Sequence, residues 1–394
     1  MAPRLRFGVF DPPLHAPGEN PTLAIQRDLE LAERLDQLGF DELWVGEHHS
    51  LGYEIVPAHE VFLAAASQRT QRIHLGTGVV SLPYHHPLIV ADRIVFLDHL
   101  TQGRAMLGVG PGAFPSDAHM MGLDYLELRR NMVDALEAVI ALIDGDEPVT
   151  RETDRFVLRD ARLNLRPCRE GRFEIAVAST LSPSGPALAG RFGVGLLSLS
   201  ATSPDGFAAL RNAWGVAEEE AARHGQTVDR ASWRLVGFYH LAETEAQARR
   251  DVRSGMADFY RYFAQLGRNG VSLVPQDTDD PDAVVDFLNN SGIAVIGTPD
   301  RMADQLRRLQ DQTGGFGAYL AFGHELADRE ATLRSHELMA RHVFPQFQGH
   351  GDRAEASFEF GTDPAFVRRI AEAWERAEKD HAASRAAADG PAAP

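Results

Sequence analysis

The sequence has a single cysteine and a single lysine, and these two shortages exclude several classes of protein. Cys168 is the only cysteine among 394 residues, so neither an intrachain disulfide nor a cysteine-cluster metal site can form. Lys379 is the only lysine, and it lies in a polar carboxyl-terminal stretch. Schiff-base aldolases, pyridoxal-phosphate enzymes and Walker-type phosphate loops all need a lysine nitrogen. We therefore exclude these classes.

Long apolar runs and an excess of positive charge are absent as well. No uninterrupted apolar run approaches the roughly 20 residues that a membrane span needs. The net charge is −17, which argues against a partner that is nucleic acid or anionic lipid. A strand-like run begins at Leu5 and leaves no room for a secretory signal. These features predict a soluble, cytoplasmic protein.

Strand-like and helix-like segments alternate regularly along the chain. Eight short and almost wholly apolar runs are each followed by a segment with helical spacing. These runs are 5–10, 42–46, 73–80, 105–109, 174–178, 194–199, 233–239 and 318–322. Strands that are apolar on both faces and separated by helices are typical of a parallel sheet. Eight such units favour a (β/α)₈ TIM barrel, an α/β fold, over a doubly wound sheet.

The same alternation of segments predicts how the chain is divided into domains. We expect one barrel domain over 1–348, with an insertion at 255–296 after the seventh strand. A Pro- and Arg-rich excursion at 147–172 is expected to hold a hairpin. From about Gly349 the sequence turns polar, which predicts a partly disordered carboxyl-terminal extension over 349–394.

A Glu47-His48-His49 segment follows the second predicted strand, where a barrel places its active residues. A metal site shared with the His85-His86 pair is one interpretation. However, adjacent strand residues point to opposite sides, so a His-His pair supplies at most one inward ligand. The helical His-Glu-x-x-His pattern is also absent. We predict no metal, and the residues alone leave open whether His48 is functional or a structural hydrogen-bonding group.

Two loops are candidates for phosphate binding. Gly108-x-Gly-x-x-Ala113 matches a dinucleotide fingerprint, but Pro111 and Pro115 obstruct the helix that must follow it directly. The segment Ser179-Thr-Leu-Ser-Pro-Ser-Gly185 is the better candidate, because small hydroxyl residues precede a helix whose amides can bind an anion. Simple capping of that helix by Ser182 or Ser184 is an equally good interpretation.

Several ordered segments resemble the bacterial-luciferase-like flavin monooxygenases. They run from about residue 5 to 347, and the set is more specific than any single piece. The segments are Phe7-Gly-Val-Phe, Gly39-Phe-Asp-Glu-Leu-Trp-Val-Gly-Glu-His-His49, Leu75-Gly-Thr-Gly-Val, His86-Pro-Leu, Leu97-Asp-His-Leu-Thr-Gln-Gly-Arg104, Leu107-Gly-Val-Gly, Ile296-Gly-Thr-Pro-Asp and His342-Val-Phe-Pro345. Within the family, the Ser-Pro-Ser-Gly and Glu-His-His segments are most similar to terpene-oxidising members such as limonene monooxygenase.

The resemblance implies a TIM barrel that binds reduced FMN, with FAD as the alternative, at its carboxyl-terminal mouth. Dioxygen would add to the flavin to give a C4a-hydroperoxyflavin, and His48 would be the catalytic histidine beside it. The family's non-prolyl cis peptide would fall at Gly78-Val79. The flavin phosphate would lie against 179–185, where the implied ligands are Ser179, Thr180, Ser182, Ser184 and Gly185. The family's arginine after strand 4 is replaced by Pro111, so the phosphate must rely on the serine loop or on another arginine.

The predicted function is a flavin-dependent monooxygenase that oxygenates a small apolar substrate, a terpene-like olefin or ketone. A deazaflavin-dependent oxidoreductase and a metal-assisted barrel hydrolase are the alternatives. Because eight βα units use up the chain, reduced flavin is expected from a separate NAD(P)H-dependent reductase. The family resemblance and the apolar residues of helices 58–69 and 87–100 predict a homodimer.

Aromatic residues in the predicted mouth loops suggest the nature of the substrate. The mouth lacks the clustered cations that a carboxylate or phosphate substrate needs. The predicted pocket residues are Phe10, Tyr84, Phe114, Tyr260 and Phe263. Packing of the insertion onto the barrel is an equally good explanation for the aromatic patch at 259–263.

Overall fold

The computed structural model describes residues 4–267, 273–275, 277–349 and 351–388. The chain divides into two compact units, Met1–Phe347 and Gln348–Pro394. No helix in these described ranges is long and apolar enough to cross a membrane.

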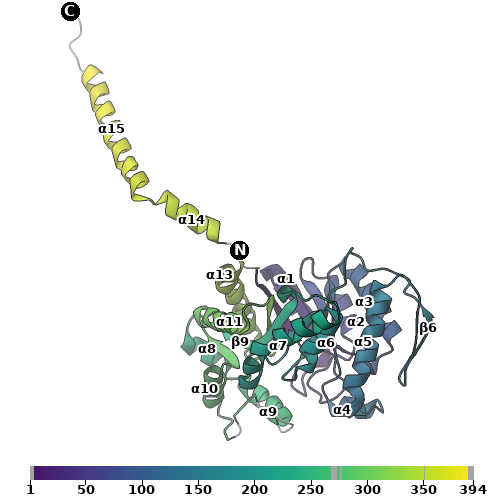
Figure 1. Cartoon of the computed structure of the whole chain (residues 1–394). Helices are drawn as coiled ribbons and strands as arrows, with labels where there is room; N and C mark the ends of the chain where they lie inside the picture. Colours follow the sequence, from purple (N-terminus) through teal and green to yellow (C-terminus); the bar gives the residue numbers. More distant parts are fainter. Residues whose placement is uncertain (1–3, 268–272, 276, 350, 389–394) are drawn as a thin grey trace, which may run out of the picture. The chain divides into compact units, whose positions relative to one another are not determined.

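The first unit is a closed barrel of eight parallel strands with helices outside it (Figure 1). Its strands are β1 (Arg6–Asp11), β2 (Glu42–Val45), β3 (His74–Ser81), β4 (Ala105–Gly110), β7 (Ile175–Ser179), β8 (Gly195–Ser198), β9 (Trp233–Leu241) and β11 (Ala318–Phe322). Neighbouring strands pair in the order β11-β1-β2-β3-β4-β7-β8, and β9 closes the ring by pairing with both β8 and β11. The predicted TIM barrel is confirmed.

The strands are apolar on both faces because each face packs against a different layer. Inside the barrel lie Phe10, Trp44, Met106, Leu197 and Leu320, which form one buried cluster with their neighbours. Alternate strand residues point outward and pack beneath the surrounding helices in a larger cluster. This two-sided burial is why the strands read as continuous apolar runs.

The outer helices begin and end at residues with recognisable capping chemistry. In α1 (Pro21–Leu38), the Asn20 side chain accepts hydrogen bonds from the first-turn amides, and Gly39 closes the helix with φ 84°. The helices that follow the other barrel strands are α2 (His59–Ser67), α3 (Pro87–Thr101), α5 (Leu128–Asp144), α6 (Ser184–Phe192), α7 (Pro204–Arg223), α8 (Glu245–Val252) and α12 (Arg329–Leu338), and α11 (Pro299–Thr313) lies between the insertion and the last barrel strand. A π-helical segment, Met339–Val343, leads from α12 into α13 (Phe344–Gln348).

Three connections carry additional structure. The excursion after α5 holds the predicted hairpin, β5 (Val149–Glu152) paired with β6 (Val157–Ala161). A short helix that sequence reasoning missed, α4 (Pro115–Met120), follows β4 after a loop. The insertion contains α9 (Met256–Gly267), α10 (Pro281–Ser291) and β10 (Ala294–Gly297). We did not expect β10, which extends the sheet by pairing in parallel with the end of β9.

The second unit differs from the expectation for 349–394. We expected a polar, partly disordered extension, whereas its described part is helical in α14 (Asp352–Gly361) and α15 (Pro364–Ala388). Alanine, glutamate and arginine are frequent here and favour helix, which outweighed the polarity that we took as a sign of disorder. Residues 389–394 of the expected extension lie outside the described residues.

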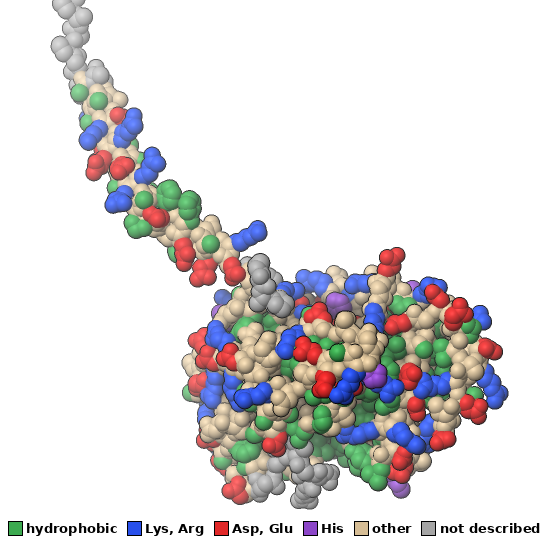
Figure 2. All heavy atoms as spheres, in the orientation of Figure 1, with side chains coloured by type: hydrophobic (Ala, Val, Ile, Leu, Met, Phe, Trp, Pro, Cys, Tyr) green, Lys and Arg blue, Asp and Glu red, His purple; other side chains and the backbone are tan. Residues whose placement is uncertain are grey.

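On the face shown in Figure 2, acidic and basic side chains are interspersed over the first unit.

Candidate active site

His48 lies in the loop after β2, between two buried carboxylates. Its Nε2 is 2.9 Å from Glu54 Oε2, and its Nδ1 is 3.4 Å from Asp117 Oδ2. Asp117 belongs to α4, so the unexpected helix after β4 delivers the second carboxylate. The ring of Phe114 lies 4.4 Å from the imidazole, centroid to centroid. Glu54 is itself held by a β-bridge to Leu14, in the loop after β1. Three loops at the carboxyl ends of strands therefore converge on this histidine.

The two carboxylates decide the charge of His48. Burial by itself lowers the pKa of a histidine, because it disfavours the charged form. Here the negative charges and hydrogen bonds of Glu54 and Asp117 outweigh burial and raise the pKa of His48 to about 9. At neutral pH the side chain is therefore an imidazolium ion. In this charged form it can donate a proton but cannot act as a base. An unperturbed histidine has a pKa near 6.5 and could do either at neutral pH.

His49 points to a different carboxylate and belongs to a separate cluster. Glu47 Oε1 lies 3.2 Å from His49 Nε2 and 2.5 Å from His85 Nε2, and Glu47 Oε2 accepts the Ser81 amide at 2.9 Å. Although burial opposes it, these partners hold the pKa of Glu47 far below its usual range. His48 and His49 thus share no carboxylate, and their arrangement does not favour the metal-assisted hydrolase that we considered as an alternative.

The peptide between Gly78 and Val79 is cis, at the position that the family resemblance implied. It coincides with the shift of register between β3 and β4, where the pairing passes from Thr77 to Val80. A side chain at Gly78 would crowd the Phe10 ring and the Cβ of Trp44, since an added Cβ would lie 3.0 Å from each. Glycine at this position therefore allows β3 to pass close to the barrel interior.

The serine loop lies where β7 ends and α6 begins. Ser182 Oγ is 2.9 Å from Ser184 Oγ and also accepts the Ser184 amide at 3.2 Å. A cavity of about 200 Å³ is lined by Ser179, Thr180 and Ser182 among other residues. Gly185 packs directly on the loop, because an added Cβ would lie only 2.5 Å from Ser179 Cβ.

One residue of this region was missed by sequence reasoning. Arg129 of α5 donates from Nη1 to Ser184 Oγ at 2.8 Å, although 55 residues separate them. Pro111 indicated that an arginine from elsewhere was needed, but nothing in the sequence pointed to Arg129. The loop and this guanidinium together form a set of donors suited to a phosphate.

The predicted pocket aromatics lie in two groups. Phe10 and Phe263 each approach Phe322 with ring centroids 6.0 Å apart, and the Phe263 ring also packs on Phe238 at 5.7 Å. Tyr260, on the same helix as Phe263, is half-buried against this cluster.

The second group borders the histidines. Phe114 contacts His48, as described above. The Tyr84 ring lies 6.1 Å from the His49 ring, and its hydroxyl approaches Gly112. Tyr262 of α9 lies in the aromatic patch at 259–263 but was not among the predicted pocket residues, and its hydroxyl donates a hydrogen bond to Glu54. No local pattern signals that contact, because the two residues are 208 positions apart.

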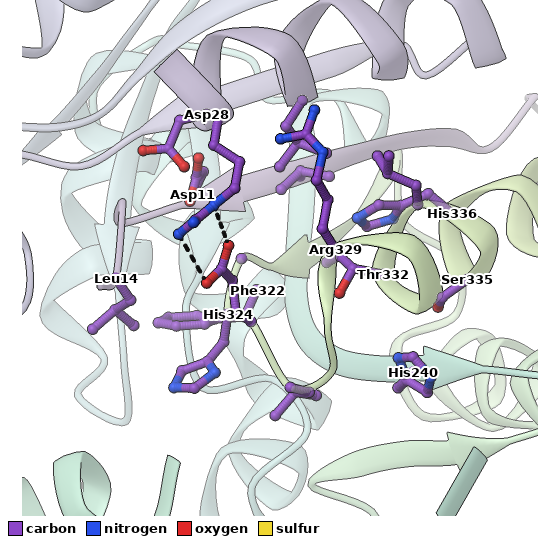
Figure 3. Close-up of a pocket in the computed structure, with 18 of the residues that line it drawn as sticks. Asp11, Leu14, Asp28, His240, Phe322, His324, Arg329, Thr332, Ser335 and His336 are labelled. Atoms are coloured by element: carbon purple, nitrogen blue, oxygen red, sulfur yellow. Dashed lines mark hydrogen bonds and ion pairs between the residues drawn. The ribbon is translucent and has the colours of Figure 1, made fainter. Parts of the chain in front are cut away.

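A further cavity, of about 70 Å³, lies beside β1 and β11 and contains none of the predicted site residues (Figure 3). Asp11 and Asp28 lie at one end of it, and His240 and His336 lie at the other. Burial and the nearby Asp28 raise the pKa of Asp11 well above its usual range. The His15, Glu19 and Glu325 side chains also approach one another here, but Arg27 pairs with both glutamates. This cluster therefore already contains its own cation.

Comparison with known proteins identifies the family. The family model for luciferase-like monooxygenases matches residues 5–315. The chain is 50% identical over 346 residues to limonene 1,2-monooxygenase from Rhodococcus erythropolis, covering 88% of this chain and 87% of that protein. The chain belongs to the luciferase-like monooxygenases. It is also 46% identical over 371 residues to 4-hydroxyprotoasukamycin monooxygenase from Streptomyces nodosus subsp. asukaensis, covering 93% and 99%.

A solved structure agrees with this membership. The oxygenating constituent of 3,6-diketocamphane monooxygenase from Pseudomonas putida, in complex with FMN, superposes with a TM-score of 0.75. It is 26% identical to this luciferase-like monooxygenase, and the match covers 88% of this chain and 99% of that one. The family, the fold and the monooxygenase class predicted from the motifs are thus confirmed.

Proposed function

We propose that the protein uses reduced FMN and dioxygen to oxygenate a small apolar substrate at the carboxyl-terminal mouth of its barrel. The observation that carries this proposal is His48 between Glu54 and Asp117, at the mouth of a luciferase-like barrel. The FMN in the 3,6-diketocamphane monooxygenase structure and the limonene-oxidising relative support it.

The serine loop suits the phosphate of FMN. Ser179, Thr180, Ser182 and Ser184 offer hydroxyl groups, and Arg129 contributes the positive charge that the family's β4 arginine would provide. The amino terminus of α6 adds main-chain amides and a favourable dipole. When bound, FMN would supply the oxygen-activating chemistry, which no side chain of this protein can perform. Gly78, Val79 and Gly185 would allow the backbone to pass close to the cofactor.

His48 would act as a proton donor at the reacting end of the site. An imidazolium can give up a proton to a developing oxyanion and recover it from solvent through its carboxylate partners. Glu54 and Asp117 would keep the ring oriented and charged, while Phe114 covers one side of it. The aromatic residues Phe10, Tyr84, Tyr260 and Phe263 would exclude water, which limits unproductive release of peroxide.

The substrate is proposed to be neutral, of roughly terpene size, and oxidised at a double bond or beside a carbonyl. The aromatic cluster around Phe263 and Phe322 offers apolar contact area. Limonene monooxygenase and diketocamphane monooxygenase act on molecules of this kind by their names, which supports the proposal.

A separate NAD(P)H-dependent reductase is proposed to deliver the reduced flavin. The relative from Pseudomonas putida is named as the oxygenating constituent of its monooxygenase, which supports a separate partner. Cytoplasmic location stays a prediction that goes with this partner.

We also propose a homodimer through α2 and α3. Of the apolar residues that motivated this prediction, Phe62 and Leu63 are buried in the core, whereas Ile89 and Phe96 are exposed. Val61 is 67% exposed on the same pair of helices. These exposed side chains would be covered by a second copy. A monomer in light scattering at micromolar concentration would contradict the dimer.

The function is tested by the formation of oxygenated product from photochemically or enzymatically reduced FMN, dioxygen and a panel of terpenes, cyclic ketones, carboxylic acids and sugar phosphates. We expect product formation with members of the first two classes and bound flavin absorbing near 450 nm. Preference for a charged acid would contradict the apolar pocket, and hydride transfer from deazaflavin without oxygen would contradict the monooxygenase.

A further inference from the structure

A single hydroxyl group links the insertion to the proposed proton donor. Tyr262, on α9, donates a hydrogen bond to Glu54 Oε1, and Glu54 Oε2 lies 2.9 Å from His48 Nε2. Glu54 is only 7% exposed and Tyr262 only 4%, so water does not compete for this chain of contacts. Asp117 contacts the other ring nitrogen from α4. Both ring nitrogens of His48 therefore contact a carboxylate, one from its own loop and one from α4, and α9 contacts the first of these carboxylates.

The direction of the Tyr262 contact follows from its chemistry. Burial and the neighbouring Glu54 both raise the pKa of the Tyr262 hydroxyl far above its usual range, so it keeps its proton and must donate. With one carboxylate oxygen bound to this hydroxyl, Glu54 cannot rotate freely, and its other oxygen stays directed at His48. Of the remaining charged groups near the ring, His49 follows His48 in the same loop and Asp117 lies on α4, and neither contributes to the raised pKa of Tyr262.

We propose that Glu54 and Tyr262 are positioning residues for His48, and that the insertion completes the proton-donating group only when α9 lies against the barrel. This inference rests on the proposed function and extends it to residues that no family motif marked. Tyr262 would not touch the reacting atoms. Its hydroxyl would act through Glu54. The packing of α9 against the barrel would therefore be coupled to the orientation and the charge of His48.

The alternative is that Tyr262 only packs the insertion. Its ring does pack, with centroids 5.0 Å from the rings of both Tyr53 and Phe263. Tyr262→Phe separates the two roles, because it keeps the ring and removes only the hydroxyl. Tyr260→Phe is the matched control, since it removes a hydroxyl two residues away on the same helix.

The first measurement is an NMR titration of histidine side chains in the flavin-free, full-length protein, with the His48 signal assigned by its loss in His48→Ala. Glu54→Gln is expected to lower the pKa of His48 by one unit or more, because it removes a carboxylate within 4 Å. Tyr262→Phe is expected to lower it by a smaller amount, and Tyr260→Phe to leave it unchanged. An unchanged His48 titration in Glu54→Gln or in Tyr262→Phe would overturn the proposal.

The second measurement is steady-state turnover with reduced FMN and the best substrate of the panel. Tyr262→Phe is expected to lower kcat about tenfold at unchanged KM, and to shift the alkaline limb of the pH profile downward. A raised KM with normal kcat and an unshifted profile would show a packing or substrate-lining role and overturn the inference. If the wild-type protein itself forms no oxygenated product, the proposed function fails while the flavin-free titration still decides the positioning role.

Discussion

The two ends of the barrel differ in whether their buried charges are balanced by charges of the opposite sign. At the amino-terminal ends of the strands, Glu42 and Arg234 are fully buried and paired, with Arg234 Nε 2.7 Å from Glu42 Oε2. Arg6 approaches the same glutamate at 2.8 Å, and Arg234 also contacts Glu174. Trp44 donates to Glu42 from inside the barrel at 2.7 Å. Two arginines thus balance the charge of two glutamates. Burial alone would raise the pKa of Glu42, but the charges of Arg234 and Arg6 lower it to about 2.

At the carboxyl-terminal end, the His48 cluster is not balanced. One imidazolium faces two carboxylates, and the buried Asp117 Oδ1 has no hydrogen-bond partner among the described residues. An excess of negative charge and an unused acceptor are costly in a buried site unless they serve a function. The comparison agrees with the general division of labour in this fold, in which the amino-terminal end stabilises and the carboxyl-terminal end reacts. The contrast can be tested by variants at both ends.

The largest effect is expected from His48→Ala, which should lower turnover by 10²–10⁴-fold, or about 3–5 kcal/mol of transition-state stabilisation. The fold should persist, because the core packing around the loop is unchanged. His49→Ala should be milder, since Glu47 keeps His85 and the Ser81 amide as partners. Steady-state kinetics with circular dichroism as the folding control measures both. An equal loss in the two variants would contradict the assignment of His48.

At the other end, Arg234→Ala should destabilise the protein by about 3–5 kcal/mol, because it leaves Glu42 buried with too little positive charge. Chemical denaturation measures the loss. The control is Arg4→Ala, which breaks the more exposed Arg4–Asp41 pair and should cost no more than about 1 kcal/mol. Similar midpoints for the two variants would show that the buried cluster is not the stabilising feature that its geometry suggests.

A smaller effect is expected on the pH dependence of stability. His48 has a folded pKa of about 9, above its unfolded value of about 6.5, so its contribution is complete below about pH 6.5. It is then lost as the pH rises through 9, and the full difference is about 3 kcal/mol. Unfolding free energies of the wild type and His48→Ala should therefore converge between pH 6 and 9.5. A constant difference across that range would contradict the raised pKa.

Much of the fold was predictable because its signals are local. The capping by Asn20 and Gly39, and the apolar strands, follow from neighbouring residues alone. The second unit shows the limit of this reasoning, since Ala-rich polar sequence is compatible with both disorder and helix. β10 was missed because only three apolar residues of this strand precede the Gly-Thr-Pro motif, and they were included in the insertion at 255–296.

The site was predictable only where a motif marks it. His48, the cis Gly78-Val79 peptide and the serine loop lie in segments that match the family. Asp117 and Tyr262 join Glu54 in the His48 cluster, and Arg129 reaches the serine loop, only after the barrel closes. No spacing in the sequence identifies these contacts. The raised pKa of His48 could not be predicted from the sequence either, because it depends on Glu54 and Asp117.

The smallest and most selective effect is expected from the double substitution Tyr260→Ala with Phe263→Ala. Phe263 is buried against Phe238 and Phe322, so part of its role is packing, which the aromatic patch at 259–263 also suggested. If these side chains also line the substrate site, their removal admits water and changes the shape of the pocket. Substrate preference should then change, and peroxide release without product should rise several-fold while flavin binding persists. The control is Phe287→Ala on α10, which weakens the same apolar cluster from its other helix. Unaltered selectivity and coupling in the double variant, or the same change in the control, would assign Tyr260 and Phe263 to packing alone.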